Sequence, residues 1–113
     1  MKLSIAGKYR TLVAVLEGDI DHHSAENLRE RIDREFSRTG AVNIAFDFSH
    51  VSFMDSSGIG LIMGRYKKVN ALGGKVIIYG LSDGVRRIID MSGVGGFVTT
   101  AKNLEYGLME AAL

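Results

Sequence analysis

The side chains best suited to chemistry gather in one short run, Phe53-Met54-Asp55-Ser56-Ser57-Gly58-Ile59-Gly60. In this run a carboxylate and two hydroxyls stand where a strand-like segment gives way to the apolar spacing of a helix. A serine there can be a catalytic nucleophile, an aspartate can accept a phosphoryl group, and any of the three can cap the helix. Capping is common and stabilises a helix by about 1 kcal/mol, so the run by itself predicts a helix N-terminus.

Three glycines, Gly58, Gly60 and Gly64, fall within the first turns of this expected helix. Each one costs about 1 kcal/mol relative to alanine in a helix interior. Close approach of a partner's backbone, or tight packing of the helix on a sheet, would explain their presence. The glycines therefore indicate a role for this segment beyond capping.

Two enzyme-like chemistries fit the residues less well. A phospho-aspartate receiver, with Asp47 or Asp55 as acceptor, needs further acidic residues after the first strand to hold Mg²⁺, and a late lysine. Neither feature is in place. An esterase needs a Gly-x-Ser-x-Gly turn, which the run lacks, and no pair of a histidine and an acid is indicated by spacing. We therefore expect a protein that is not an enzyme and has no catalytic residue.

Metal and cofactor sites are not indicated either. His22 and His23 are adjacent, so their side chains diverge on an extended loop, and His50 has no evident companion ligand. The Gly73-Gly74-Lys75 stretch lacks the longer pattern of a phosphate-binding loop, and we interpret it as a helix-to-strand turn. We expect neither a metal nor a cofactor.

Strands and helices alternate along the chain after an opening hairpin with its turn at Gly7-Lys8, which predicts an α/β fold with right-handed crossovers. The expected strands cover residues 3–6, 9–16, 42–48, 75–79 and 97–99. The expected helices cover 24–38, the segment from the Asp55-Ser56-Ser57 cluster to the glycines at 73–74, the segment from Ser82 to Gly93, and a last helix capped by Thr100. This is a mixed central sheet of about five strands with four helices.

Length and composition favour one folded, soluble domain over residues 1–113, because 46% of the residues are apolar and 24% are charged. The formal net charge of +1 gives no basic field for nucleic acid or membrane surfaces, and the absence of cysteine excludes disulfides. The first residues lack the apolar run of a signal peptide, and the apolar stretch at 59–63 is too short to cross a bilayer. We therefore expect no binding to nucleic acid and no insertion into a membrane.

Three stretches carry a resemblance to a known family: 18–26 (GDIDHHSAE), 52–60 (SFMDSSGIG) continuing through 64–67 (GRYK), and 90–93 (DMSG). In order and separation they resemble the anti-sigma factor antagonists of the STAS domain superfamily, most closely those that act on the sigma F pathway in sporulation. The similarity extends over nearly the whole chain and weakens before Tyr9 and after Phe97. It implies the STAS-type fold, with a mixed sheet and an opening β-hairpin.

The resemblance also implies a mechanism, known as partner switching. The unphosphorylated antagonist binds an anti-sigma factor that is also a serine kinase, and this frees the sigma factor in the cytoplasm. Phosphorylation on Ser56, with Ser57 as the alternative acceptor, releases the antagonist, and a metal-dependent serine phosphatase restores it. ATP and metal would then belong to the partners, and a general stress sigma pathway is the alternative to sporulation.

The partner-binding surface implied by the resemblance lies around the phosphorylated serine. It comprises Asp21, His23, Asp55, Ser57, Gly58, Ile59 and Gly60. Asp21 can instead merely cap the first helix, and Ile59 can instead belong to the core. Arg65, Lys67 and Lys68 are interpreted as a solvated cationic helix end, which suits the helix dipole whatever the function.

Overall fold

The computed structural model describes residues 1–6 and 9–112 of the chain, and its centre is a five-stranded sheet in the order β1-β2-β3-β4-β5. The strands are β1 (Lys2–Ala6), β2 (Thr11–Glu17), β3 (Asn43–His50), β4 (Val76–Tyr79) and β5 (Thr99–Thr100). β1 pairs with β2 in antiparallel fashion, and each later pair of neighbours is parallel. The predicted mixed sheet is confirmed, while the turn predicted at Gly7-Lys8 lies outside the described residues.

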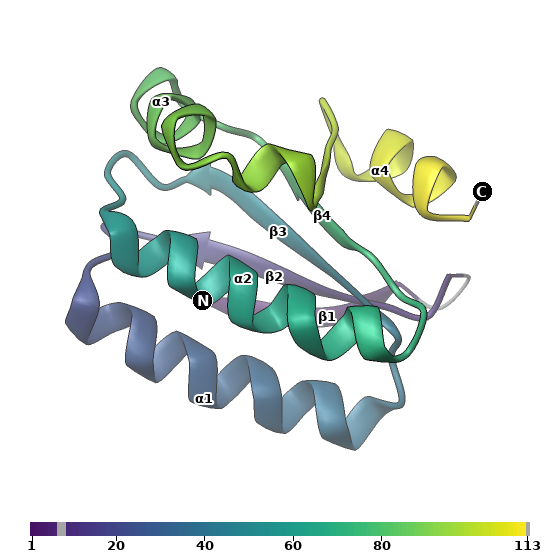
Figure 1. Cartoon of the computed structure of the whole chain (residues 1–113). Helices are drawn as coiled ribbons and strands as arrows, with labels where there is room; N and C mark the ends of the chain where they lie inside the picture. The colour runs from purple at the N-terminus through teal and green to yellow at the C-terminus, as the bar shows by residue number, and fades with distance from the viewer. Residues whose placement is uncertain (7–8, 113) are drawn as a thin grey trace.

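Within the described residues, four α-helices cover the two faces of the sheet unequally. They are α1 (His22–Thr39), α2 (Ser56–Ala71), α3 (Asp83–Ser92) and α4 (Leu104–Ala111), and a short 3-10 helix, η2 (Val94–Gly96), follows α3. Figure 1 shows α1 and α2 lying side by side along one face, with α3 beyond the start of α2 and α4 set apart near the C-terminus. The predicted four helices are therefore confirmed.

The central strand β3 shows why the sheet needs cover on both faces. Ile44, Phe46 and Phe48 belong to the main core, which they share with buried residues of α1, α2 and α3. Ala45, which points to the other face, belongs to a second core with Ile77 under α4. The predicted alternation of large residues with a small one is thus the pattern of a strand covered on both sides.

The C-terminal boundaries differ from the prediction. Asn103, not Thr100, caps α4, and its side-chain oxygen accepts a hydrogen bond of 3.0 Å from the Tyr106 N–H. Thr100 is instead paired with Ile78 in the edge strand β5. Phe97, predicted to begin that strand, continues the 3-10 turn by donating its N–H to the Val94 carbonyl at 2.9 Å. The prediction was wrong here because two residues three positions apart, Thr100 and Asn103, could each cap the helix.

The start of β2 also lies two residues later than predicted. Arg10 adopts the left-handed conformation, with φ of 50°, directly before the strand begins at Thr11. The Arg10 carbonyl accepts the N–H groups of Val42 and Asn43 at 2.9 and 3.3 Å, and its guanidinium donates to the Gly40 carbonyl at 2.8 Å. These bonds stabilise a bend that side-chain alternation in the sequence does not reveal.

Candidate functional site

Two helices begin side by side at one edge of the sheet. Just beyond the ends of β2 and β3, Ile20 and Met54 form a parallel bridge. The Ile20 N–H donates to the Phe53 carbonyl, and the Asp55 N–H donates to the Ile20 carbonyl, each at 3.0 Å. The next residue in each segment is the N-cap of a helix, so this bridge holds the starts of α1 and α2 together.

Asp21 is the N-cap of α1 and forms a capping box with Ser24. The Ser24 N–H donates to Asp21 Oδ1 at 2.9 Å, and the Asp21 N–H donates to Ser24 Oγ at 3.0 Å. The hydrogen bond from the Ser24 backbone, together with that of its side chain, lowers the pKa of the Asp21 carboxyl. Because the pKa is lowered, the ionised Asp21 carboxylate stabilises the fold at neutral pH. This stabilisation is lost as the pH falls through the lowered pKa.

Asp55 is the N-cap of α2, which settles the capping role within the Asp55-Ser56-Ser57 cluster. Asp55 Oδ1 accepts a hydrogen bond of 2.8 Å from the Ser57 N–H. The two hydroxyls are therefore not needed as caps, and within residues 1–6 and 9–112 neither forms a hydrogen bond. The Ser56 side chain is exposed to solvent, whereas Ser57 is half-buried.

Ser57 faces a groove between α1 and α2. The groove has a volume of about 340 Å³ and is lined by His22, Ala25, Glu26, Arg29, Ser57, Gly60 and Leu61. Ala25, Gly60 and Leu61 give it a partly apolar lining, and Glu26 and Arg29 of α1 give it charged side chains. Sequence reasoning did not identify the α1 residues Glu26 and Arg29, because spacing along one helix does not show which residues of another helix lie opposite.

The three glycines of α2 have different structural reasons. Gly58 is buried, and a Cβ atom there would overlap the side chain of Met54, itself buried. At Gly60 and Gly64 a Cβ atom would meet none of the described residues within 4 Å, apart from the adjoining backbone of α2. Tight packing therefore explains Gly58, while Gly60 and Gly64 each cost about 1 kcal/mol of helix stability without a packing need.

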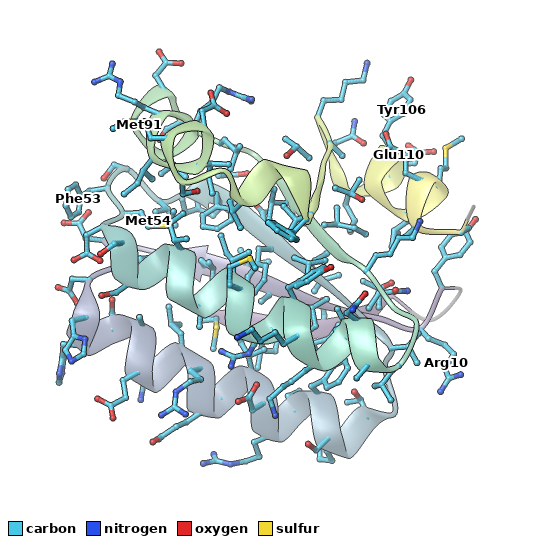
Figure 2. The ribbon with its side chains drawn as sticks, in the orientation of Figure 1. Arg10, Phe53, Met54, Met91, Tyr106 and Glu110 are labelled. Carbon is cyan, nitrogen blue, oxygen red and sulfur yellow. The ribbon has the colours of Figure 1, made fainter. Side chains whose placement is uncertain are left out.

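The remaining predicted residues fall on or near the same edge. His23 is exposed in the first turn of α1, and Ile59 is half-buried with one side against the main core. Phe53, directly before the α2 cap, is 53% exposed, and Met91 near the end of α3 is 80% exposed. Figure 2 shows Phe53 and Met91 at the same end of the molecule, an apolar feature that sequence reasoning missed.

Arg65 corrects the prediction of a solvated cationic helix end. It is only 4% exposed, and its Nε lies 3.0 Å from Asp33 Oδ1 of α1. Lys67 is exposed, and Lys68 lies half in solvent with its Nζ 3.8 Å from Asp33 Oδ2. Burial lowers the pKa of the Arg65 guanidinium, against the opposing effect of the Asp33 charge.

Other kinds of site receive no support from the described residues. Among them no group of three or more histidine, cysteine, aspartate or glutamate side chains is arranged to hold a metal ion. Asp47, the alternative phosphate acceptor, accepts hydrogen bonds from the Ser49 N–H at 2.8 Å and from its hydroxyl. None of the described helices has the length and apolar character needed to span a membrane.

Comparison with known proteins places these features in a family context. The STAS domain family matches residues 2–107. An anti-sigma F factor antagonist of Paenibacillus polymyxa is 37% identical over 83 residues, which are 74% of this chain and 71% of that protein. An anti-sigma-B factor antagonist of Bacillus subtilis (strain 168) is 31% identical over 93 residues, 82% of this chain and 84% of that protein.

Two solved structures share both fold and sequence with the chain. The anti-sigma factor antagonist SpoIIAA in its unphosphorylated form superposes with a TM-score of 0.82 at 31% identity, over 99% of this chain and 96% of that one. The Bacillus cell fate determinant SpoIIAA in its phosphorylated form gives a TM-score of 0.71 at 32% identity, over 93% and 94% of the two chains.

Proposed function

The chain belongs to the anti-sigma factor antagonists of the STAS domain family, and we propose that phosphorylation of Ser56 switches its binding to an anti-sigma factor off. The choice of Ser56 as the acceptor rests on the different roles of the three residues Asp55, Ser56 and Ser57. Asp55 caps α2, Ser57 is half-buried against the groove, and Ser56 presents an exposed hydroxyl without a hydrogen bond among the described residues. That hydroxyl is the one open to a kinase, and Ser57 is the alternative acceptor.

The switch works through charge at a contact surface. A phosphoryl group adds about −1.5 to −2 charges, which the positive end of a helix tolerates. The Asp55 carboxylate directly precedes this residue in the chain and repels the phosphate in part, and the bridge between Ile20 and Met54 holds the start of α1, which Asp21 caps, to the start of α2. The folded antagonist can carry the phosphate because the positive helix end offsets this repulsion, while a partner pressed against this edge meets an uncompensated, desolvated charge.

The partners follow from this function. The unphosphorylated form binds an anti-sigma factor with serine kinase activity and so releases the sigma factor in the cytoplasm. A metal-dependent serine phosphatase removes the phosphate, and ATP and metal are bound by these partners. We favour the sigma F pathway of sporulation, since the relative from Paenibacillus polymyxa acts on anti-sigma F. The relative from Bacillus subtilis supports the general stress pathway as the second candidate.

Intact-mass analysis and peptide mapping test the proposal directly. After incubation with an anti-sigma kinase, ATP and Mg²⁺, we expect one acid-stable addition of about 80 Da, the mass of one phosphoryl group, on Ser56. An acid-labile phosphate on Asp47 or Asp55 would instead support the receiver-like alternative. An unmodified Ser56 would leave a STAS binding module that is regulated in another way.

Replacing Asp21 by asparagine should separate its two roles. Asparagine caps a helix about as well as aspartate, so we expect the melting temperature to change by no more than about 2 °C. If the carboxylate contacts a basic residue of the anti-sigma factor, the affinity should fall about tenfold, as for one lost charged contact. Melting curves and titration calorimetry measure the two effects. Unchanged affinity would assign Asp21 to the capping box alone.

A further inference from the structure

The groove between α1 and α2 has features that the fold does not require. It opens beside Ser57 and runs along the two helices, away from the capping aspartates. Gly60 lies in it and is exposed, without the positive φ that would demand glycine. Alanine is the better helix former, and apart from the adjoining backbone of α2 its methyl group would meet no atom of the described residues within 4 Å. The absence of a side chain at Gly60 therefore indicates that a binding partner approaches α2 closely at this position.

The charged side chains around the groove favour a bound segment that carries an acidic side chain. Arg29 lines it from α1, with His22 and a single carboxylate, Glu26. Arg65 is buried between the two helices, where Asp33 lies 3.0 Å from its Nε, but within the described residues its Nη1 has no hydrogen-bond partner. The positive charges of Arg29 and Arg65 interact unfavourably with each other. An anion brought to this end of the groove would offset that repulsion.

We propose that the groove is a second part of the partner-binding surface and receives a segment of the anti-sigma factor that places an acidic side chain against Arg29. The inference rests on the proposed function, because it takes the anti-sigma factor as the occupant. Continuity is the reason for this choice: Ser57 both borders the groove and directly follows Ser56. A partner that covers Ser56 closely enough to be repelled by its phosphate lies at the mouth of the groove.

The shape of the groove can be tested with two identical substitutions on one helix. Gly60→Ala and Gly64→Ala each add one methyl group where no other group lies within 4 Å, but only Gly60 lines the groove. Both should raise the melting temperature by a few degrees, about 4 °C each. Gly60→Ala should weaken binding of the anti-sigma factor at least tenfold, while Gly64→Ala should leave it within twofold. Equal affinities of the two variants would overturn the proposal.

The charge of the occupant can be tested in the same way on α1. Arg29→Glu reverses a charge in the groove, and Arg34→Glu makes the same change at an exposed position of α1 outside the groove. We expect at least a tenfold loss of affinity for Arg29→Glu and less than a twofold loss for Arg34→Glu. If both variants bind equally well, the segment in the groove carries no acidic contact and this part of the proposal is wrong.

The unaltered protein separates failure of this inference from failure of the proposed function. If the unphosphorylated chain does not bind the anti-sigma factor at all, the proposed function itself is contradicted. If the chain binds it and loses it on phosphorylation, while the Gly60→Ala variant binds equally well, only the groove is excluded. Titration calorimetry with the four variants and the unaltered chain, at one ionic strength, covers both cases.

Discussion

Replacing Ser56 by aspartate should weaken binding of the anti-sigma factor at least tenfold, whereas Ser56→Ala should bind as well as the unmodified chain and resist inactivation by the kinase. A phosphate on Ser56 carries up to twice the charge of aspartate, so phosphorylation should lower the affinity for the anti-sigma factor about a hundredfold. A hundredfold loss corresponds to about 2.7 kcal/mol, which is within the cost of burying one unpaired charge in an interface. Titration calorimetry of the three forms measures these losses.

The loss of affinity cannot be attributed to unfolding, because a negative charge at residue 56 interacts favourably with the dipole of α2. Residue 56 is the first residue of α2, where a negative side chain interacts favourably with the helix dipole by about 0.3–1 kcal/mol. The adjoining Asp55 carboxylate offsets part of this gain, so the Ser56→Asp variant should melt within a few degrees of the unaltered chain. Ser37→Asp, at an exposed position of α1, is the matched control for net charge and should bind normally. Equal affinity of Ser56→Asp and Ser56→Ala would contradict repulsion by charge.

The arrangement of helices and strands was largely predictable because the spacing of apolar residues agrees with the positions of the glycines and capping residues along the chain. Ala25, Leu28, Ile32 and Phe36 recur at helical spacing, and all four are buried in α1, which ends at a left-handed Gly40. The predicted cap cluster does begin α2. The C-terminal boundaries failed where neighbouring residues could serve equally well, since both Thr100 and Asn103 are good caps and only pairing with β4 decides between them.

The site was predictable in part only, because much of it depends on which residues of two helices lie opposite each other. The sequence indicates that Asp55, Ser56 and Ser57 begin a helix, but it does not indicate which of them is the cap. It assigns the same cost to each glycine of α2, although Gly58 is required by packing on Met54 and Gly60 is not. Their different surroundings come from tertiary contacts, which no local pattern encodes.

Arg65 was mistaken for a surface residue for the same reason. A basic residue in the second half of a helix is normally solvated and favourable to the helix dipole, so the prediction followed the usual case. The chain instead packs this side chain between α1 and α2, where Asp33 supplies the opposite charge from the neighbouring helix. An ion pair across a helix interface leaves no trace in the spacing of either helix alone.

The two partners of this ion pair should respond unequally to substitution. The Arg65 side chain is 5% exposed and that of Asp33 is 23% exposed. Removing the carboxylate with Asp33→Ala leaves a buried guanidinium without a counter-charge and in repulsion with Arg29, which should cost about 3–5 kcal/mol. Removing the guanidinium with Arg65→Met leaves a carboxylate that is partly exposed to solvent and still has Lys68 Nζ at 3.8 Å, so the expected cost is about 1–2 kcal/mol.

The double variant Asp33→Ala/Arg65→Met gives the sharper test. Methionine fills much of the space of the arginine stem without a charge, so the double variant should be more stable than Asp33→Ala alone. Urea denaturation of the four proteins closes a double-mutant cycle, and we expect the two single costs to be strongly non-additive. Equal costs for the two single variants, with additivity in the double one, would mean that the guanidinium is solvated in solution. Because small domains are stabilised by only about 5–15 kcal/mol in total, the Asp33→Ala variant alone should show this ion pair in its melting curve.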